Sequence, residues 1–574
     1  MKKIVSIILV LSMIASLGIA MGVSAAYTPE GTAITNAAEF AAMTVDGKYY
    51  LSNDITIDAT YAETFAGTLD GNGKTITTSV PVFATLGSAT VKNLKLAGEI
   101  NISEAVDAGV LTVTVAGASN LVIDNVENNC KLTVAAKKDV GGFIGVMGYG
   151  GCYGTTITIK NSTNNGDITG GWRVGGFIGY MPGSDKEETP FTVVMDNCVN
   201  NGTIASTESY SGGFIGRFGG VNVTTGKCSM TIKNSTNNGV VSAAVSQVGG
   251  FAGYVLGKLI VEYSVNNANL TATEGNNMQI GGIIGVCGAE TNYNCDGAIV
   301  RYCINNGKIS TTSKAGGIVS NLGNSKATQG ACLVENCINF GEITVENCVS
   351  SGTTYAGGIA GYMYGGSGEG SNTIRNCLNL GNITGTTTAA SGKNYAGGIL
   401  AYVNGKGITV ANNLNLGNIT LVSETTNAKF THTFFNNRST DSAEACANNY
   451  SVAQAGITLL DFNGVADPCT TVITAADAAL VEKLGAAWKM GDKNPEPIIE
   501  GTVGGTGADF SIFVEVPETT APETTEPAPE TTEPAPETTE PGASEDTGDS
   551  AIIFAVLAVI AVAGVAVVSK KKEN

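Results

Sequence analysis

Apolar and polar positions alternate along most of this chain in a pattern that repeats every 29 to 40 residues. Each repeat contains a charged residue followed by a short segment that ends in Asn-Asn-Gly or a close variant, as in KNSTNNG at 160–166. An apolar residue precedes the segment and another follows it, which predicts a β-strand on either side. A third strand is predicted at a Gly-Gly-apolar motif such as VGGF at 174–177. Three short strands and three corners in about 36 residues predict one coil of an all-β solenoid, a parallel β-helix.

The charged residue that opens the segment alternates in sign along the chain. The column reads Lys92, Asp124, Lys160, Asp196, Lys233, Glu262, Arg301, Glu335 and Arg375. If one repeat is one coil, neighbouring members stand about 4.8 Å apart, so every charge has opposite charges above and below it. Exposed pairs contribute only about 0.2 to 1 kcal/mol each, and we interpret the column as favouring the correct order of coils.

A pair of glycines recurs eight times, whereas a phosphate-binding loop would occur once in a domain. The first members are Gly141, Gly175, Gly212, Gly249, Gly281, Gly316, Gly357 and Gly397. We expect these glycines to allow a tight corner with positive φ and to leave room where the backbone of the next coil approaches. The residue after each pair should then form a stacked interior column, which is Phe143, Phe177, Phe214, Phe251, Ile283, Ile318, Ile359 and Ile399.

An asparagine occupies the same position of every segment. The column is Asn128, Asn164, Asn200, Asn237, Asn266, Asn305, Asn339, Asn379 and Asn415. Asparagine tolerates tight turns, and stacked amides can bond from coil to coil, so a structural role is predicted for this column.

With these repeats the chain resembles right-handed parallel β-helix surface proteins of pectin-lyase-like shape, in particular those with GLUG-type repeats. The segments at 34–57 and 65–96 look like the opening coils of that family, and the resemblance extends from about residue 33 to 449. It implies a right-handed β-helix and says little about function.

Both termini carry targeting signals. Residues 1–26 combine MKK, an apolar run and VSA, as in a secretory signal peptide. Residues 551–568 are apolar or small and precede three lysines, which predicts a membrane-spanning helix with its basic end inside. This tail resembles the sorting signal of Gram-positive surface proteins, but SEDTG at 544–548 keeps only the Thr-Gly of Leu-Pro-x-Thr-Gly. We therefore expect retention by the membrane helix, with covalent attachment to the cell wall left open.

The predicted organisation has six parts. They are a signal peptide (1–26), N-terminal capping and first coils (27–100), a repeat β-helix (101–450), a C-terminal cap with a helix at 475–485 (451–516), a disordered Pro/Thr/Glu-rich stalk (517–549) and a transmembrane anchor with a basic tail (550–574). The stalk repeats PETTEPA and cannot bury a core, so it should extend as polyproline II.

Composition excludes several kinds of function. Fifty acidic against 31 basic residues argue against nucleic-acid binding. Some relatives with such repeats are zinc peptidases that cleave immunoglobulins, but their His-Glu-x-x-His site cannot exist in a chain with one histidine. We predict no metal, no cofactor and no catalytic residue. The 13 cysteines are expected to be mostly free and buried, because several share a column with serines of other coils.

One set of aromatic residues could bind a ligand. Tyr180, Tyr254, Tyr362 and Tyr402 follow the glycine motif, and Trp172 lies nearby. If the column faces outward, these rings could stack on sugars; the alternative is that they cover the outer face of their own sheet. The sequence favours a non-enzymatic adhesin that binds glycans, host matrix or other cells outside a Gram-positive bacterium. A surface polysaccharide lyase or hydrolase and a purely structural surface-layer protein are the alternatives.

Overall fold

The computed structural model describes the chain between residues 27 and 504, with gaps. The described residues are 27–147, 153–182, 190–220, 228–272, 277–288, 295–323, 330–347, 353–365, 372–387, 394–404, 407–423, 429–431, 446–454, 470–474, 476–499 and 504. They belong to a compact unit that ends at Glu515. The predicted signal peptide, stalk and transmembrane anchor therefore lie outside the described residues. Within the described part of the chain, no helix has the length and apolar character needed to cross a membrane.

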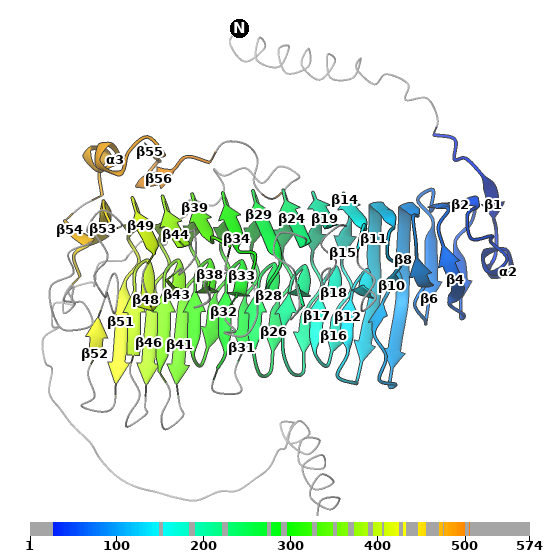
Figure 1. The fold of residues 1–574 in the computed structure, drawn as a ribbon, viewed down its shortest axis with the longest axis horizontal. Coiled ribbons are helices and arrows are strands. Elements are labelled where there is room, and N and C mark those ends of the chain that lie inside the picture. The colour runs from blue at the N-terminus through cyan, green and yellow to red at the C-terminus, as the bar shows by residue number, and fades with distance from the viewer. Residues whose placement is uncertain are drawn as a thin grey trace, which may run out of the picture. The chain divides into compact units, whose positions relative to one another are not determined.

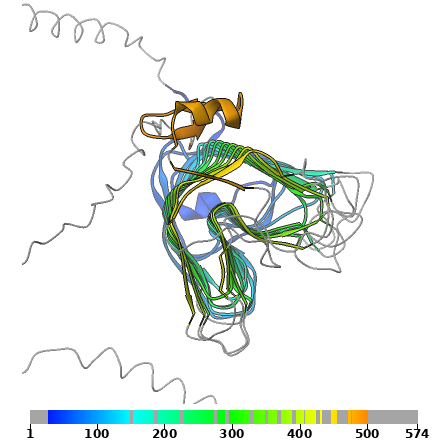
Figure 2. The same ribbon diagram turned by 90° about the vertical axis from the view of Figure 1, so that its left-hand side faces the viewer.

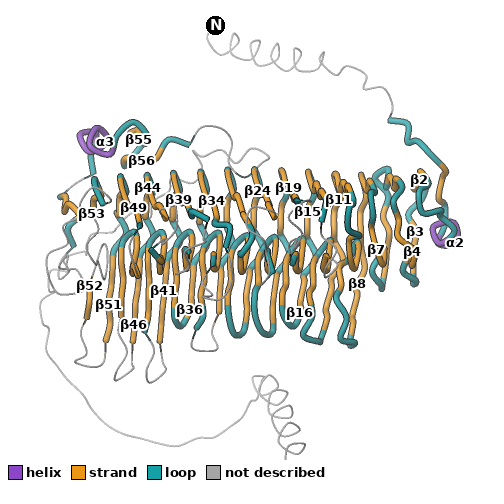
Figure 3. Tube along the Cα trace, viewed as in Figure 1, coloured by secondary structure: helices purple, strands orange, loops and turns teal. Residues whose placement is uncertain are grey.

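The chain folds into a parallel β-solenoid whose strands stack into three sheets along one axis (Figures 1 and 3). In one coil the chain passes through β19 (Phe191–Asp196), β20 (Val199–Asn200) and β21 (Ile204–Ser206) of the 33-stranded sheet A. It then enters β22 (Ser211–Gly212) of the 10-stranded sheet C and β23 (Ile215–Phe218) of the 11-stranded sheet B. Hydrogen-bonded side chains of neighbouring coils here are 36 or 37 residues apart, so one coil corresponds to one sequence repeat, as predicted.

Strands follow one another along the axis of sheets B and C in chain order. Sheet B contains β4 (Tyr61–Phe65), β7 (Phe83–Leu86), β10 (Thr112–Val115), β13 (Ile144–Met147), β18 (Ile178–Met181), β23, β28 (Ala252–Val255), β33 (Ile284–Cys287), β38 (Val319–Leu322), β43 (Ala360–Tyr364) and β48 (Leu400–Asn404). Sheet C contains β9 (Ala108–Gly109), β12 (Asp139–Gly141), β17 (Arg173–Gly175), β22, β27 (Gln247–Gly249), β32 (Gln279–Gly281), β37 (Lys314–Gly316), β42 (Thr354–Gly357), β47 (Asn394–Gly397) and β52 (Lys429–Thr431). The charged column lies on sheet A strands β8 (Thr90–Ile102), β11 (Asn120–Val134), β14 (Thr156–Lys160), β19, β24 (Cys228–Lys233), β29 (Lys258–Glu262), β34 (Ala298–Arg301), β39 (Leu333–Glu335) and β44 (Asn372–Arg375).

The residue after each glycine pair is buried in the solenoid. Its side chain is at most 1% exposed in Phe143, Phe177, Phe214, Phe251, Ile283, Ile318, Ile359 and Ile399. The four phenyl rings stack with centroid distances of 4.8, 4.9 and 4.6 Å. Strands of neighbouring coils stand about 4.8 Å apart, so this stacking follows from the register of one coil per repeat. The predicted interior column is confirmed.

The alternating charges form a ladder on sheet A. Their strands pair in register, so that each charged residue lies beside the next one of the column. Nitrogen-to-oxygen distances of 2.7 to 3.3 Å join Lys160 to Asp124, Lys233 to Asp196, Arg301 to Glu262 and Arg375 to Glu335. Each of these cations pairs with the acid of the preceding coil, and the predicted alternation is confirmed.

The most buried carboxylate of this ladder should contribute the most to stability. Glu335 is 9% exposed, and its Oε2 accepts hydrogen bonds from Nε and Nη2 of Arg375 at 2.9 and 2.7 Å. We expect Glu335→Gln to lower the free energy of unfolding by about 1 to 2 kcal/mol, as measured by chemical denaturation. The control is Glu127→Gln, which removes the exposed pair of Glu127 with Lys95 at 3.7 Å and should cost under about 0.5 kcal/mol. Equal losses in both variants would contradict this ranking.

The glycine pairs form the corner between sheets C and B, which turns toward the middle of the cross-section (Figure 2). A Cβ atom on Gly175 would lie 2.0 Å from the carbonyl oxygen of Ile178. One on Gly176 would lie 2.2 Å from the carbonyl oxygen of Gly213 in the next coil. Neither position can hold a side chain, so the prediction that the glycines leave room for approaching backbone is confirmed.

The prediction of positive φ at these glycines is wrong. Among the described residues, every glycine with positive φ lies outside the eight pairs. The left-handed conformation occurs instead just after the charged residue of the ladder, for example at Asn161 (φ 52°), Asn197 (φ 54°) and Asn234 (φ 50°). Asparagine adopts this conformation at small cost, which explains its use there. The paired glycines are required by space and not by backbone angle.

The asparagine column is buried directly beneath the glycine corner. Each of its nine side chains, from Asn128 to Asn415, is 0–1% exposed. Asn200 donates from Nδ2 to Oδ1 of Asn237 at 2.8 Å and to the carbonyl oxygen of Gly202 at 3.0 Å. A Cβ atom on Gly176 would lie 2.6 Å from Oδ1 of Asn200, so the ladder and the corner are in close contact. The predicted coil-to-coil amide bonds are confirmed.

The N-terminal end of the core is closed by a short helix. Helix α2 (Ala37–Ala41) begins after the N-cap Asn36, whose side chain accepts a hydrogen bond from the backbone N–H of Glu39. Phe40 is 1% exposed and its ring lies 5.8 Å from that of Phe83 on β7. An apolar side chain thus covers the first coils, where stacked strands would otherwise end on solvent.

The C-terminal segment packs along the side of the last coils. Helix α3 (Ala478–Leu484) lies within 475–485, where the periodicity predicts a helix, and β55 (Trp488–Met490) pairs antiparallel with β56 (Pro495–Pro497). Leu480, Leu484 and Trp488 form an apolar cluster with Ile338, Leu378, Leu414 and Tyr450, against which Phe340, Leu380 and Leu416 pack. The last three replace an asparagine of earlier coils, such as Asn165 and Asn201. This position of the repeat is therefore apolar in the coils that the C-terminal segment covers and polar in the earlier coils.

Candidate functional site

Sheets B and C face each other across a crease beside the glycine corner. On the side of sheet C it is lined by the residues two positions before each first glycine: Asp139, Arg173, Tyr210, Gln247, Gln279, Lys314, Tyr355 and Tyr395. On sheet B it is lined by the residues five positions after the same glycine: Val146, Tyr180, Arg217, Tyr254, Val286, Asn321, Tyr362 and Tyr402. Contacts join the two columns, such as the 3.1 Å hydrogen bond from Nδ2 of Asn321 to Oε1 of Gln279. These two columns are called the crease below.

The N-terminal end of the crease holds a buried ion pair. Nε of Arg173 lies 2.7 Å from Oδ1 of Asp139, and the two side chains are 5% and 1% exposed. The guanidinium carbon of Arg173 lies 3.8 Å from the ring centre of Trp172 and 3.6 Å from that of Tyr180. Burial raises the pKa of the Tyr180 hydroxyl. At this end the aromatic rings enclose a cation of the protein itself.

In the middle of the crease a second guanidinium lies among tyrosines. Arg217 is 7% exposed, and its guanidinium carbon lies 5.0 to 5.9 Å from the ring centres of Tyr180, Tyr210 and Tyr254. Its Nε donates to the carbonyl oxygen of Gly219 at 3.3 Å. None of the ion pairs among the described residues includes Arg217. The ring faces of these tyrosines attract its positive charge.

The C-terminal end of the crease is a cluster of five tyrosines: Tyr355, Tyr362, Tyr364, Tyr395 and Tyr402. The rings of Tyr355 and Tyr395 stack at 5.3 Å, and those of Tyr362 and Tyr402 stack at 4.9 Å. Burial raises the pKa of the Tyr355 and Tyr362 hydroxyls, and neighbouring tyrosines raise it further. Tyr355, Tyr364 and Tyr402 remain partly exposed, so this end presents aromatic surface to solvent.

Lys314 lies beside this tyrosine cluster. Its Nζ is 5.8 Å from the ring centre of Tyr355 and 5.2 Å from that of Tyr362, and it donates a long hydrogen bond of 3.4 Å to Oδ1 of Asn277. Burial lowers the pKa of the Lys314 ammonium to about 8. The site thus keeps a weakly compensated cation next to exposed ring faces.

The lowered pKa of Lys314 predicts a pH dependence of stability. Its ordinary pKa is 10.5, so between about pH 8 and 10.5 the unfolded chain binds the proton more tightly than the folded chain does. The free energy of unfolding should therefore rise with pH in this window, relative to Lys314→Met, which lacks the group. Denaturation of both proteins at pH 7 and pH 10 measures the difference. A difference that is constant, or that falls toward pH 10, would contradict the burial of this ammonium.

The crease contains every tyrosine that the sequence singled out, but most of them are not exposed. Tyr180, Tyr254 and Tyr362 are 6%, 1% and 8% exposed, whereas Tyr402 and Trp172 are partly exposed. The column lies against the facing sheet, so neither the outward-facing arrangement nor the cover of an outer sheet face describes it fully. Sequence reasoning missed the facing column on sheet C. Its signal is the position two residues before each glycine pair, where Tyr355 and Tyr395 stand.

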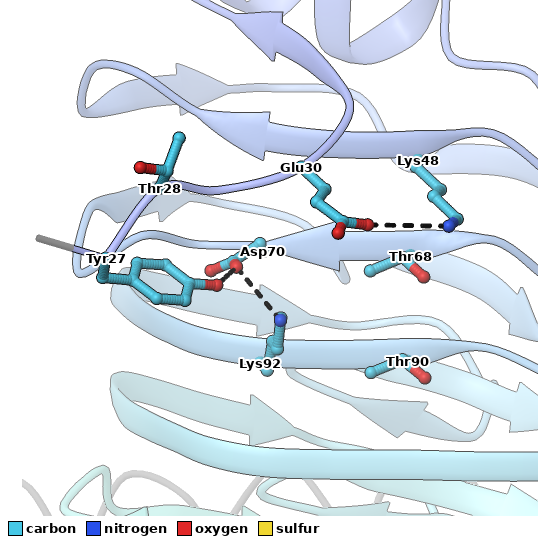
Figure 4. A pocket seen from close by; sticks show the side chains of 8 residues that line it. All are labelled: Tyr27, Thr28, Glu30, Lys48, Thr68, Asp70, Thr90 and Lys92. Carbon is cyan, nitrogen blue, oxygen red and sulfur yellow. Dashed lines mark hydrogen bonds and ion pairs between the residues drawn. The ribbon is translucent and has the colours of Figure 1, made fainter. Parts of the chain in front are cut away.

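A second hollow lies near the N-terminus, with a volume of about 300 Å³ (Figure 4). It is lined by Tyr27, Thr28, Glu30, Lys48, Thr68, Asp70, Thr90 and Lys92. Lys92 pairs with Asp70 at 3.3 Å and Lys48 with Glu30 at 3.7 Å. Burial would raise the pKa of Asp70, but hydrogen bonds, first of all from the Tyr27 hydroxyl, lower it overall. These charges neutralise one another and fasten residues 27–30 to the first coils.

The crease differs in chemistry from the cysteines elsewhere in the described residues. No group of three or more His, Cys, Asp or Glu side chains in this part of the chain is placed to hold a metal ion. The ten described cysteines are free and buried, which confirms the prediction for them. Burial raises the pKa of Cys130 and of Cys198 to about 12, so these thiols stay protonated. The crease, in contrast, offers ring faces, amides and cations.

Comparison with known proteins identifies no family for this chain. No family model matches the chain, and no curated protein does. One solved structure, named a "putative immunoglobulin A1 protease" from Bacteroides ovatus, is similar over 43% of this chain and 79% of its own, with 18% sequence identity and a TM-score of 0.33. GLUG-type repeats and a sorting signal therefore remain predictions from the sequence.

Proposed function

We propose that this protein is a non-enzymatic adhesin of the bacterial surface that binds glycans, matrix proteins or neighbouring cells through the crease. The observation that carries the proposal is the tyrosine cluster at its C-terminal end, where Tyr355, Tyr364 and Tyr402 are partly exposed. Rings of this kind present flat apolar faces on which sugar rings stack, and their hydroxyls donate and accept hydrogen bonds.

The proposal includes how the protein is displayed. A signal peptide at 1–26, a Pro/Thr/Glu-rich stalk and an apolar anchor at 551–568 are what the sequence provides for export and tethering in a Gram-positive bacterium. We also infer that the solenoid is a right-handed member of the GLUG-type β-helix proteins. Connections between parallel strands are right-handed in about 98% of cases, which supports this handedness.

A polysaccharide lyase or hydrolase is the second candidate. Asp107 and Asp139 lie on neighbouring coils, Asp139 pairs with Arg173, and the backbone N–H of Asp139 donates to Oδ1 of Asp107 at 3.1 Å. Two carboxylates and a guanidinium are groups that acid–base chemistry on sugars can use. Asp139 is 1% exposed and already paired, which makes it poorly accessible to a substrate and leaves binding as the better proposal.

A glycan and matrix-protein array probed with the purified full-length protein tests the proposal. We expect binding without release of sugar fragments, and at least a tenfold loss of affinity in Tyr402→Ala. Tyr27→Ala, which changes a tyrosine that is 57% exposed outside the crease, is the matched control and should bind normally. Release of fragments would favour the enzyme. Absence of any binding would favour a purely structural surface-layer protein.

A further inference from the structure

Lys314 lacks, among the described residues, the acidic partner that the cations of the charge ladder have. The lysines and arginines of the charge ladder pair with acids, and Arg173 pairs with Asp139. Among the described residues no carboxylate lies within 4 Å of Nζ of Lys314, whose one hydrogen bond, to Asn277, is 3.4 Å long. An ammonium has three donors, so the group retains the capacity to bind an anion.

The contrast with Arg217 shows which cation a ligand could reach. Arg217 also lacks a carboxylate among the described residues, but it is 7% exposed and surrounded by Tyr180, Tyr210 and Tyr254. Lys314 is only partly buried, its neighbour Tyr355 is partly exposed, and so is Tyr402, which contacts Tyr355. An uncompensated charge is thus accessible at only one of these two places.

The tyrosine rings beside Lys314 determine which other chemical group the ligand must carry. Tyr355 contacts Tyr402 edge-on at 5.2 Å and stacks on Tyr395, which is 3% exposed and fixed in the crease. Tyr402 in turn stacks on Tyr362. The partly exposed rings are therefore held rigidly by buried ones, which lowers the entropy cost of binding a flat apolar ligand face.

We propose that the Lys314 end of the crease binds a saccharide residue that carries a carboxylate. The sugar ring would stack on Tyr402 and Tyr355, while the carboxylate would accept a hydrogen bond from Nζ of Lys314. The inference rests on the proposed function and names the chemical class of its ligand. Because the chain as a whole carries a net charge of −19, this attraction must be local, and it is best measured near 0.15 M salt, where the Debye length is about 8 Å.

The test compares acidic and neutral forms of the same sugar. Full-length protein is titrated with methyl glucuronide and with methyl glucoside, and binding is followed by NMR of the sugar. The two sugars differ only at C6, which is a carboxylate in the first and a hydroxymethyl group in the second. An array that pairs acid-terminated glycans with their neutral parents extends the comparison to longer chains. We expect at least a tenfold preference for the acidic form, lost in Lys314→Met and kept in Lys314→Arg. Lys308→Met, which changes a 69% exposed lysine nearby in sequence, is the control.

The outcomes separate the inference from the proposed function. Equal binding of acidic and neutral forms, or a preference that survives in Lys314→Met, would overturn the inference and leave the adhesin proposal standing. No binding of any saccharide or matrix protein would overturn both. If Lys314→Met does not fold, the wild-type comparison of the two sugars, together with the behaviour of Lys314→Arg, decides the question.

Discussion

Replacing Asn237 with alanine is expected to lower the free energy of unfolding by about 3 to 5 kcal/mol, because one side chain serves three partners in a buried ladder. Its Nδ2 donates to Oδ1 of Asn266 at 2.8 Å and to the carbonyl oxygen of Gly239 at 3.2 Å. Its Oδ1 accepts from Nδ2 of Asn200 at 2.8 Å. The variant leaves these groups unsatisfied at a site with 0% exposure. Chemical denaturation followed by circular dichroism measures the loss.

The adjacent residue provides a matched control. Asn238 also takes part in a coil-to-coil ladder, donating to Oδ1 of Asn201 at 2.9 Å and accepting from Asn267 at 2.8 Å, but its ladder is exposed. Water can replace these bonds, so Asn238→Ala should cost under about 0.5 kcal/mol. Similar losses in the two variants would show that burial does not set the contribution of the ladder.

A methyl group on Gly249 should be as damaging as the loss of an asparagine. The added Cβ would lie 2.0 Å from the carbonyl oxygen of Ala252 and 2.7 Å from the backbone nitrogen of Gly285 in the next coil. Both obstacles are backbone atoms, so no change of rotamer relieves the clash and the corner itself must move. We expect Gly249→Ala to lose about 3 kcal/mol or more, or to fail to fold, as seen in thermal unfolding.

Gly73→Ala separates the effect of space from that of backbone angle. Gly73 has φ of +74°, and a Cβ there would meet no atom within 4 Å. The substitution should cost about 1 kcal/mol from backbone strain alone. If Gly73→Ala were the more damaging of the two, backbone angle would matter more than space at the paired glycines, contrary to the structure.

The stacking of coils could be predicted from the sequence because it leaves periodic signals. A charge that alternates from Lys92 to Arg375 is needed only if successive repeats lie side by side, and the ladder has this register. The residue after each glycine pair is apolar because it is buried, so the interior column from Phe143 to Ile399 could be predicted from the repeat. Each of these features depends on contacts between equivalent positions of neighbouring coils.

The crease could not be predicted in the same way, because it depends on how two sheets are angled within one coil. The angle between the two sheets at the Gly357 corner decides whether Tyr362 points to solvent or packs against Tyr355. No periodic pattern in the sequence depends on that angle. The same corner explains the wrong expectation of positive φ, since tight packing and left-handed backbone both favour glycine. Periodicity predicts helix α3, whereas its position beside Phe340, Leu380 and Leu416 follows from three apolar residues in a column that is polar in earlier coils.

Footprinting shows directly whether ligands bind at the C-terminal end of the crease. Hydroxyl-radical labelling of the full-length protein, with and without the strongest glycan or matrix protein found on the array, reports the exposure of each tyrosine. We expect the ligand to protect Tyr355, Tyr364 and Tyr402, while Tyr27 keeps its labelling. Protection confined to other regions, such as the hollow around Tyr27, would contradict it.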